Sequence, residues 1–390
     1  MSSRIIYLDN AASTPVSGEV KKEMDRGLAL EGNPSSYNDE GRKARKALEE
    51  ARLKISRFLG ARTQEVIFTS SGTEANNLAI KGAAGTSGKG EIITTPIEHP
   101  SVIGPVKYLA RRGYKAIYLS VDRYGLIDPE ELKKKITSRT LLISVMYANN
   151  EIGTIEPVLK ISKIVKEFRG RSSRNYPLFH IDACQAAGYL DMNVNRLKAD
   201  LLSFNGAKLY GPKGIGVLYV RRGVRLHPEM LGGNQESGLR AGTENLPAIL
   251  GLAQAVSMIK REEGKKTAEL RDYFIRQIKR KLPEAVLNGP EGDQRLPNNI
   301  SISISGLSSE NILLELDKHK IYAGNGSACT ARSVEPSHVL KAIGREAKYM
   351  NGTIRFSLGR QTTKKDIDYV LKVLPRVIDN LRKRYNKTGV

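Results

Sequence analysis

The sequence contains few of the residues from which disulfide frameworks and zinc sites are built. Only two of its 390 residues are cysteine, Cys184 and Cys329, and five are histidine, with no two histidines four residues apart. These counts exclude a disulfide scaffold, a four-cysteine zinc site and a helical histidine site, so we expect no bound metal. Long apolar runs are also missing, and residues 1–13 contain too short an apolar stretch for a secretory signal. We therefore expect no membrane span and a location in the reducing cytoplasm.

Acidic residues are scarce relative to basic ones. The chain has 41 aspartates and glutamates against 63 lysines and arginines, which gives a formal net charge of +22 at pH 7. Such a charge is typical of proteins that bind nucleic acids or membrane surfaces. The basic residues are spread along the chain, however, and aromatic residues make up only 6% of it, so no basic stripe interleaved with aromatics forms. We expect a solvated basic surface that favours acidic partners, and no nucleic-acid function.

Through the first 220 residues, short apolar runs of strand length alternate with helical patterns. The clearest helical pattern covers residues 39–60, where apolar side chains recur every three or four positions. The alternation predicts an α/β fold with a mostly parallel seven-stranded sheet covered by helices on both faces. Strands are expected at residues 65–70, 91–96, 115–120, 140–148, 178–183, 200–204 and 215–220.

The pattern changes after residue 243 and indicates a smaller α+β domain. A long helical stretch covers residues 245–282 and is expected to divide around Gly264, and Pro375 is expected to kink the last helix. We expect the large domain to end near residue 255. The remaining elements are strands at residues 299–304, 321–323 and 353–358 and helices at residues 310–319, 337–343 and 364–384.

Glycine-rich segments offer one plausible anion site. Residues 211–216 lack the spacing of a dinucleotide fingerprint, and residues 82–90 end in Gly-Lys-Gly, which excludes a P-loop. Residues 69–74, Thr-Ser-Ser-Gly-Thr-Glu, lie between a strand and a helix, where backbone N–H groups and hydroxyls can face an anion. The same residues fit a capping box equally well, with Ser71 as the N-cap and Glu74 at its third helical position.

An acid and a lysine follow two neighbouring strands. Asp182 ends one buried strand, and Lys208 lies 26 residues later in a glycine-flanked loop. Taken singly, such an acid is usually a cap or an ion-pair partner, and such a lysine lies on the surface. Together they are what pyridoxal phosphate (PLP) requires, because the lysine forms a Schiff base and the carboxylate keeps the pyridine nitrogen protonated.

Ten short motifs occur in order along nearly the whole chain. They are residues 7–12 (YLDNAA), 32–35 (GNPS), 68–74 (FTSSGTE), 98–99 (EH), 149–153 (NNEIG), 180–185 (HIDACQ), 208–214 (KLYGPKG), 240–245 (RAGTEN), 326–330 (GSACT) and 354–359 (IRFSLG). Together they resemble the PLP-dependent cysteine desulfurases of group I (NifS/IscS-like), which belong to the class-V aminotransferases. The combination is specific, although no single motif would be.

The resemblance implies a fold-type I architecture and a homodimer with active sites at the subunit interface. Its large PLP-binding domain would cover residues 15–255, and its small domain residues 1–14 and 256–390. The resemblance also assigns the residues that contact the cofactor. Lys208 would form the Schiff base, Asp182 would bind the pyridine nitrogen, and His99 would stack on the ring face and take part in catalysis. Gln185 and Asn150 would contact the O3′ side, and the phosphate would be bound by Gly72 and Thr73, with Asn205 nearby and Thr243 reaching across from the other subunit.

The resemblance further implies how the substrate, L-cysteine, is bound and cleaved. Arg355 would clamp the substrate carboxylate beside Asn150, and Cys329 would be the nucleophile that carries sulfur away as a persulfide. The products would be L-alanine and sulfur for an acceptor such as an iron–sulfur scaffold, with Cys329 a candidate transient cluster ligand. The alternatives are a selenocysteine lyase, another PLP aminotransferase-like enzyme, or a basic scaffold protein with impaired cofactor binding.

The residues themselves also distinguish the two cysteines. Cys329 lies in a polar, glycine-rich loop, which suits a thiol that must deliver sulfur, whereas Cys184 sits at a strand end and is expected to be a small buried residue. Two positions depart from the family pattern. Ala207 stands where a histidine commonly precedes the Schiff-base lysine, and Ser237 stands where an arginine is usual. The first departure predicts looser retention of the cofactor, and the second an altered partner or dimer contact.

Overall fold

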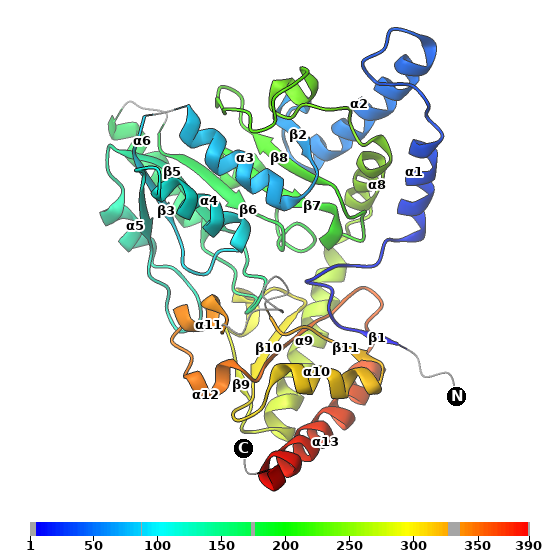
Figure 1. The fold of residues 1–390 in the computed structure, drawn as a ribbon, viewed down its shortest axis with the longest axis vertical. Coiled ribbons are helices and arrows are strands. Elements are labelled where there is room, and N and C mark those ends of the chain that lie inside the picture. The colour runs from blue at the N-terminus through cyan, green and yellow to red at the C-terminus, as the bar shows by residue number, and fades with distance from the viewer. Residues whose placement is uncertain (1–4, 87, 173–175, 327–335, 389–390) are drawn as a thin grey trace.

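The computed structural model describes residues 5–86, 88–172, 176–326 and 336–388 (Figure 1). A seven-stranded sheet lies in the upper part of this view, with strand order β2-β8-β7-β6-β5-β3-β4. Strand β8 runs antiparallel to β2 and β7, and the other neighbours are parallel, so the predicted mostly parallel seven-stranded sheet is confirmed. The strands are β2 Val66–Thr69, β3 Glu91–Thr94, β4 Lys115–Tyr118, β5 Thr140–Met146, β6 Leu178–Asp182, β7 Leu201–Asn205 and β8 Gly216–Val220.

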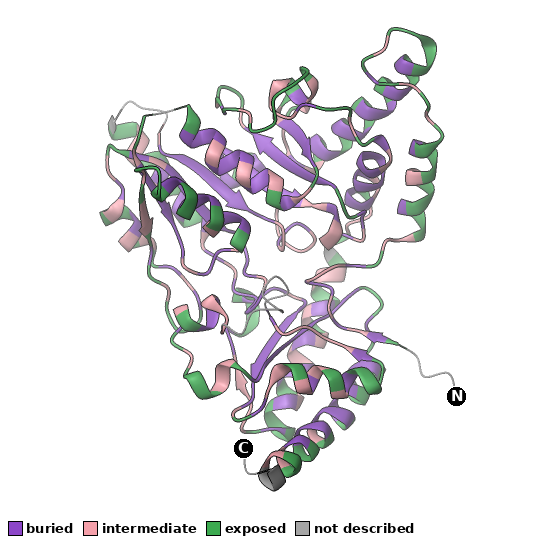
Figure 2. Ribbon diagram, in the orientation of Figure 1, coloured by how far each residue is buried: buried purple, intermediate pink, exposed green. Residues whose placement is uncertain are grey.

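Helices cover both faces of this sheet, as the strand–helix alternation predicts. Figure 2 shows the strands largely buried beneath helices whose outer surfaces are exposed. One face packs against α2 Asp39–Leu59, α6 Val158–Ser172 and α8 Leu246–Ser257, and the other against α3 Gly72–Gly85 and α4 Pro100–Ala110. The remaining helices of this part are α1 Gly18–Leu28, which packs on α8, α5 Pro129–Lys135 and α7 Val194–Leu197, with 3₁₀ turns η1 Thr63–Glu65, η2 Gly206–Lys208 and η3 Gln235–Gly238.

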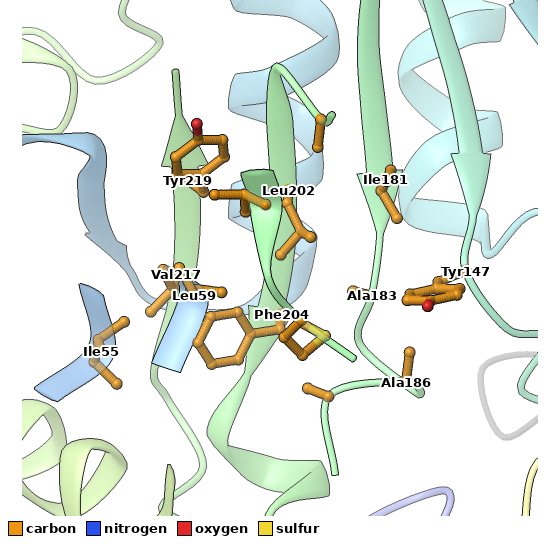
Figure 3. Close-up of a cluster of buried hydrophobic side chains, with 14 of the residues drawn as sticks. Ile55, Leu59, Tyr147, Ile181, Ala183, Ala186, Leu202, Phe204, Val217 and Tyr219 are labelled. Carbon is orange, nitrogen blue, oxygen red and sulfur yellow. The ribbon is translucent and has the colours of Figure 1, made fainter. Parts of the chain in front are cut away.

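The alternation of side chains along the strands gives the two faces different characters. Ile181, Phe204 and Val217 point to one face and belong to the same apolar core as Ile55 and Leu59 of α2 (Figure 3). The opposite face, beneath α3 and α4, carries apolar side chains together with a buried polar row at the centre of the sheet. The members of that row are Ser144 on β5, His180 and Asp182 on β6 and Ser203 on β7.

A second core lies in the lower part of Figure 1. Ile6 and Leu8, from the start of the chain, pack there with Phe274 and Phe356 from its last third. This shared core is why we propose that residues 1–14 and 256–390 form the small domain and residues 15–255 the large one. Its elements are β1 Ile6–Tyr7, α9 Arg261–Lys281, β9 Val286–Leu287, η4 Gly292–Gln294, β10 Asn299–Ser303, α10 Ser309–Lys318, β11 Ile321–Tyr322, α11 His338–Ala342, α12 Ala347–Met350, β12 Thr353–Ser357 and α13 Lys364–Thr388.

One boundary differs from the sequence-based expectation, and the kink expected at Pro375 stays a prediction. The long helical stretch divides at residues 258–260 rather than at Gly264, because Lys260 adopts an extended backbone (φ −117°, ψ 125°) and Gly264 lies inside the first turns of α9. Helix α13 continues through Pro375 as one element. In the part of the chain that the structure describes, no helix is both long and apolar enough to cross a lipid bilayer.

A buried ion pair holds the loop of η3 against the sheet. The two guanidinium Nη atoms of Arg52 donate to the two carboxylate oxygens of Glu236 at 2.9 and 2.7 Å, and the backbone N–H of Phe68 donates to the same carboxylate at 2.8 Å. These contacts stabilise two consecutive left-handed residues, Glu236 (φ 45°) and Ser237 (φ 58°).

We predict that Glu236→Gln lowers the free energy of unfolding by about 3–5 kcal/mol, because it leaves the buried Arg52 charge without its partner. Urea denaturation followed by circular dichroism measures the change. Glu23→Gln removes one partner of the exposed Glu23–Arg26 pair and serves as the control, with an expected change of about 0–1 kcal/mol. Equal effects of the two substitutions would contradict the assignment of a buried pair.

Candidate functional site

A cavity of about 310 Å³ opens where strands β5, β6 and β7 end. The carboxyl ends of parallel strands are the usual place for ligands in α/β sheets. Nine of the eleven predicted site residues line this cavity: Gly72, Thr73, His99, Asn150, Asp182, Gln185, Asn205, Lys208 and Arg355. Thr243 is exposed and does not line it within the single chain, and Cys329 lies outside the described residues. The roles assigned to all eleven remain predictions.

The N-terminus of α3 forms one wall of the cavity. Ser71 Oγ accepts a hydrogen bond from Glu74 N at 3.1 Å, so Ser71 is the N-cap as expected. Glu74 Oε2 accepts from the N–H of Ser70 at 2.7 Å and not from that of Ser71, so the expected capping box is incomplete. The anion-site interpretation survives beside it, because the cap engages the N–H of Glu74. The N–H groups of Gly72 and Thr73 stand at the start of the helix, where no intrahelical acceptor exists.

Gly72 lies in close contact with the floor of the cavity. A methyl group added at Gly72 would lie 2.5 Å from Cys184 Sγ and 2.9 Å from Asn205 Nδ2. Cys184 is half-buried and lines the cavity, so the prediction of a simple buried residue is corrected. Burial and the neighbouring Asp182 raise the pKa of the Cys184 thiol well above its usual value, so the thiol stays protonated and is a poor nucleophile.

Asp182 is held in place by two donors. Its Oδ1 accepts from the backbone N–H of Cys184 at 3.0 Å, and its Oδ2 accepts from Asn76 Nδ2 at 2.8 Å. Asp182 is the last residue of β6, and its side chain lies on the face covered by α3, from which Asn76 projects. The carboxylate is therefore fixed at the cavity wall and needs no counter-cation to be satisfied.

His99 is the N-cap of α4 and lines the cavity. Its Nδ1 accepts from the backbone N–H of Ser101 at 3.1 Å and lies 2.7 Å from Ser101 Oγ. Burial lowers the pKa of His99, an effect opposed by Asp182 and reinforced by the positive charges of Lys208 and His338. The imidazole therefore favours its neutral form at the cavity.

Lys208 is the last residue of η2, and its Nζ donates to the backbone oxygen of Ala12. The N-terminal segment is also tied to the lysine turn by Thr14, whose N and Oγ1 donate to the oxygen of Ala207 at 2.8 and 3.1 Å. Ala207, the position that departs from the family pattern, lines the cavity. Its methyl group offers no hydrogen-bond donor, and the looser cofactor retention expected from the missing histidine remains a prediction.

Arg355 is 1% exposed and lies on β12 of the small part. Its Nη2 donates to Asp9 Oδ1 at 2.8 Å, and its Nη1 donates to the backbone oxygens of Asn150 and Gly326 at 2.8 and 2.9 Å. Its Nε has no hydrogen-bond partner among the described residues. A buried N–H without a partner at a cavity wall is a position where a bound carboxylate completes the hydrogen bonding.

Described residues on both sides of the Cys329 segment are anchored at the cavity. On one side Gly326 O accepts from Arg355, and on the other Ser337 Oγ donates to Glu151 Oε2 at 2.5 Å. His338 Nε2 lies 2.9 Å from the backbone oxygen of Glu98, and both Glu151 and His338 line the cavity.

The residues of the cavity fit PLP. A helix N-terminus suits its phosphate, a fixed carboxylate suits its pyridine nitrogen, and a lysine suits its aldehyde carbon. Asn205 Oδ1 is buried and has no hydrogen-bond partner among the described residues, so a ligand group that donates a hydrogen there would complete its hydrogen bonding.

Sequence reasoning missed four residues that shape the site. They are Asn76, Ser101, Glu151 and Asp9, none of which was singled out. Glu151 and Asp9 lie inside motifs, so their positions were visible although their contacts were not. Asn76 and Ser101 follow the motifs by two residues each, and only the packing of α3 against α4 shows that they meet.

Comparisons with known proteins point in one direction. The family model described as aminotransferase class-V matches residues 6–370. A cysteine desulfurase IscS from Dictyoglomus turgidum is 48% identical over 386 residues, which are 97% of this chain and 96% of that protein. A cysteine desulfurase from Trichormus azollae is 45% identical over 383 residues, with 97% of this chain and 94% of that protein covered.

Solved structures show the same relationship. A structure titled NifS-like protein has a TM-score of 0.89 at 35% identity and covers 97% of this chain and 100% of that chain. A structure titled SspA in complex with cysteine has a TM-score of 0.79 at 35% identity, covering 92% of this chain and 100% of that chain.

We predict that Gly72→Ala weakens PLP binding roughly 10- to 100-fold, because relieving the contacts with Cys184 and Asn205 shifts the start of α3. Equilibrium dialysis followed by the absorbance of bound PLP measures the effect. Gly104→Ala, in α4, adds a methyl group with nothing within 4 Å and should leave binding unchanged. Adding Cys184→Ala to Gly72→Ala should restore part of the affinity, and a failure of Gly72→Ala to weaken binding would refute the close contact.

Proposed function

The chain belongs to the class-V aminotransferase family, and within it we propose a PLP-dependent cysteine desulfurase that converts L-cysteine to L-alanine and leaves the sulfur on Cys329. The observation that carries the proposal is a single cavity. Lys208, Asp182 and Arg355 converge there from three different elements. The described residues on either side of the segment that contains Cys329, Gly326 and Ser337, bond to the cavity residues Arg355 and Glu151. The bound cysteine of one structural neighbour is consistent with the same substrate.

In this proposal the cofactor is held by residues of the large part. Lys208 binds it covalently, Asp182 keeps its pyridine nitrogen protonated, and Gly72 and Thr73 donate backbone N–H groups to its phosphate. Gln185 and Asn150 would contact its O3′ side, His99 would lie against its ring, and Asn205 would lie near its phosphate. When bound, PLP supplies an electron sink at the α-carbon of the substrate.

Arg355 orients the substrate through its carboxylate. Asp9 already occupies one Nη2 hydrogen of the guanidinium, and backbone oxygens accept from Nη1, so the fork is locked in direction before substrate arrives. The Nε–H of this fixed guanidinium has no partner among the described residues and is left to bind the substrate carboxylate. A locked guanidinium binds a carboxylate without losing side-chain freedom at that moment.

Two residues of the chain carry the chemical step. The amine of Lys208, once released from the cofactor, accepts the α-proton of the substrate. The thiolate of Cys329 attacks the substrate sulfur, and the carbon–sulfur bond breaks as the new sulfur–sulfur bond forms. One cysteine and one enzyme thiol thereby give one alanine and one enzyme persulfide, so atoms and electrons balance without an external oxidant.

The persulfide then passes to an acceptor, which we propose to be a protein such as an iron–sulfur scaffold. We also propose a homodimer, in which the exposed Thr243 contributes to the site of the partner subunit. A thiol that must remain reduced between turnovers suits the cytoplasm. A transaminase would have no use for this thiol, which separates the proposal from the general aminotransferase alternative.

We predict that Cys329→Ser abolishes production of alanine and of reductant-released sulfide from L-cysteine, because serine cannot attack the substrate sulfur. The PLP absorbance should be retained, since the cofactor residues lie on other elements. Cys184→Ser is the matched control and should keep most of the activity, because its thiol is already protonated and unreactive. Normal turnover by Cys329→Ser would refute the role of Cys329.

We predict that Arg355→Lys raises the KM for L-cysteine roughly 30-fold or more, since a point charge replaces a planar fork worth about 2–4 kcal/mol. Steady-state kinetics measure the change. Arg271→Lys alters another buried arginine, one that donates to the backbone oxygens of Arg295 and Leu296, and controls for general loss of stability. An unchanged KM in Arg355→Lys would contradict the assignment.

A further inference from the structure

A chain of buried hydrogen bonds connects the centre of the sheet with the two cavity residues Asp182 and His99. Its hub is Asn76 of α3, which is fully buried beneath the cavity floor. Asn76 Nδ2 donates to Asp182 Oδ2 at 2.8 Å and to Ser101 Oγ at 2.8 Å. Buried polar groups are costly unless each has a partner, so every hydrogen in this chain has to be accounted for.

The hydrogen positions follow from the charge on Asp182. An ionised carboxylate only accepts, so the atom of Asn76 that faces it is the Nδ2 amide nitrogen. The two hydrogens of Nδ2 are then used on Asp182 and on Ser101 Oγ. Ser101 Oγ, which accepts from Asn76, has its own hydrogen left to donate to His99 Nδ1 at 2.7 Å. The backbone N–H of Ser101 donates to the same Nδ1 at 3.1 Å.

The hydrogen bonds that lead from the amide oxygen of Asn76 toward the centre of the sheet fit the same hydrogen positions. Its Oδ1 accepts from Ser203 Oγ, which in turn lies 3.2 Å from His180 Nε2, and His180 Nδ1 lies 2.8 Å from Ser144 Oγ. Burial lowers the pKa of His180 to about 4, so this ring is neutral and has one hydrogen, on Nε2. The chain is thus satisfied from Ser144 to His99 by one arrangement of hydrogens.

We propose that Asn76 and Ser101 are positioning residues that hold the His99 imidazole neutral, with its hydrogen on Nε2. Two donors point at Nδ1, so a proton can be added there only if the Ser101 hydroxyl turns away, and Asn76 opposes that turn. His99 therefore presents a donor, not a base, on its Nε2 side. Between His99 and Lys208, it is then Lys208 that is left to take the α-proton.

Among the described residues, the charged and titratable groups that act on His99 are Asp182 from β6, Lys208 from η2 and His338 from α11. Asp182 favours the imidazolium, and Lys208 and His338 oppose it. These charges shift the protonation of the ring as a whole. The hydrogen-bond chain acts on Nδ1 alone and therefore also fixes the tautomer.

The test is the titration of [¹⁵N]histidine-labelled, PLP-loaded protein by NMR, with His99→Gln to assign the signal and the exposed His227 as an internal reference. Wild-type His99 should carry its hydrogen on Nε2. Ser101→Ala and Asn76→Ala should each raise the ratio of charged to neutral His99 at a fixed pH roughly fivefold, the effect of one ordinary hydrogen bond. Ser101→Thr keeps the hydroxyl and should restore the wild-type value.

The double variant tests transmission through Ser101. Because Asn76 reaches Nδ1 of His99 through that hydroxyl, Asn76→Ala should have a much smaller further effect once Ser101→Ala is present, and what remains reports its second hydrogen bond, to Asp182. Ser56→Ala, which removes an equally buried hydroxyl bonded only within α2, should change nothing at His99. A wild-type Nδ1–H tautomer, or additive effects of Asn76→Ala and Ser101→Ala, would overturn the proposal. If Asn76→Ala does not fold, the comparison of Ser101→Ala with Ser101→Thr decides.

The proposal depends on the proposed function only where it gives the neutral His99 a part in the reaction. The NMR titration reads the ring whether or not the protein desulfurates cysteine. Failure of the function therefore appears in the alanine assay, and failure of the hydrogen-bond chain appears in the titration.

Discussion

The two cores of the molecule meet at the guanidinium of Arg355. This side chain belongs to β12, yet it donates to Asp9 of the N-terminal segment, to Asn150 after β5 and to Gly326 before the Cys329 segment. Breaking these contacts would leave a buried charge unpaired, a loss large enough to keep the four segments in one arrangement. The cavity therefore depends on this group for its shape as well as for its charge. If Arg355 binds the substrate as we propose, substrate binding is coupled to the anchoring of the segment that contains Cys329.

The strands of the large sheet could be predicted from the sequence because each is a short apolar run bounded by turn residues, and β5 and β6 follow this rule closely. The ends of those strands could be predicted as a site for the same reason. What could not be predicted is which side chains meet across elements. Asn76 and Ser101 are 25 residues apart, and their 2.8 Å contact exists only because α3 and α4 pack on the same face. The left-handed Ser237 was also invisible, since local sequence does not favour that backbone there.

The two cysteines illustrate how environment divides one chemistry between two roles. Cys184 lies beside Asp182, and both burial and that negative charge disfavour its thiolate. A thiol in this position can pack against Gly72 and bond to its neighbours without competing for the substrate sulfur. The transferable thiol must then lie where a thiolate is tolerated and where an acceptor can reach it. The polar, glycine-rich sequence around Cys329 meets both conditions.

A buried polar row beneath a catalytic cavity costs stability, since apolar side chains would cover the same face of the sheet more cheaply. Ser144, His180 and Ser203 occupy positions on β5, β6 and β7 whose neighbours on that face are leucines. Their hydrogen bonds have one satisfied arrangement, and it ends at Asp182 and His99. The polar row therefore lowers stability but fixes which atoms of the cavity donate hydrogen bonds and which accept them. In the proposed function, such a fixed pattern is the reason that Lys208, and not the nearby His99, acts as the base.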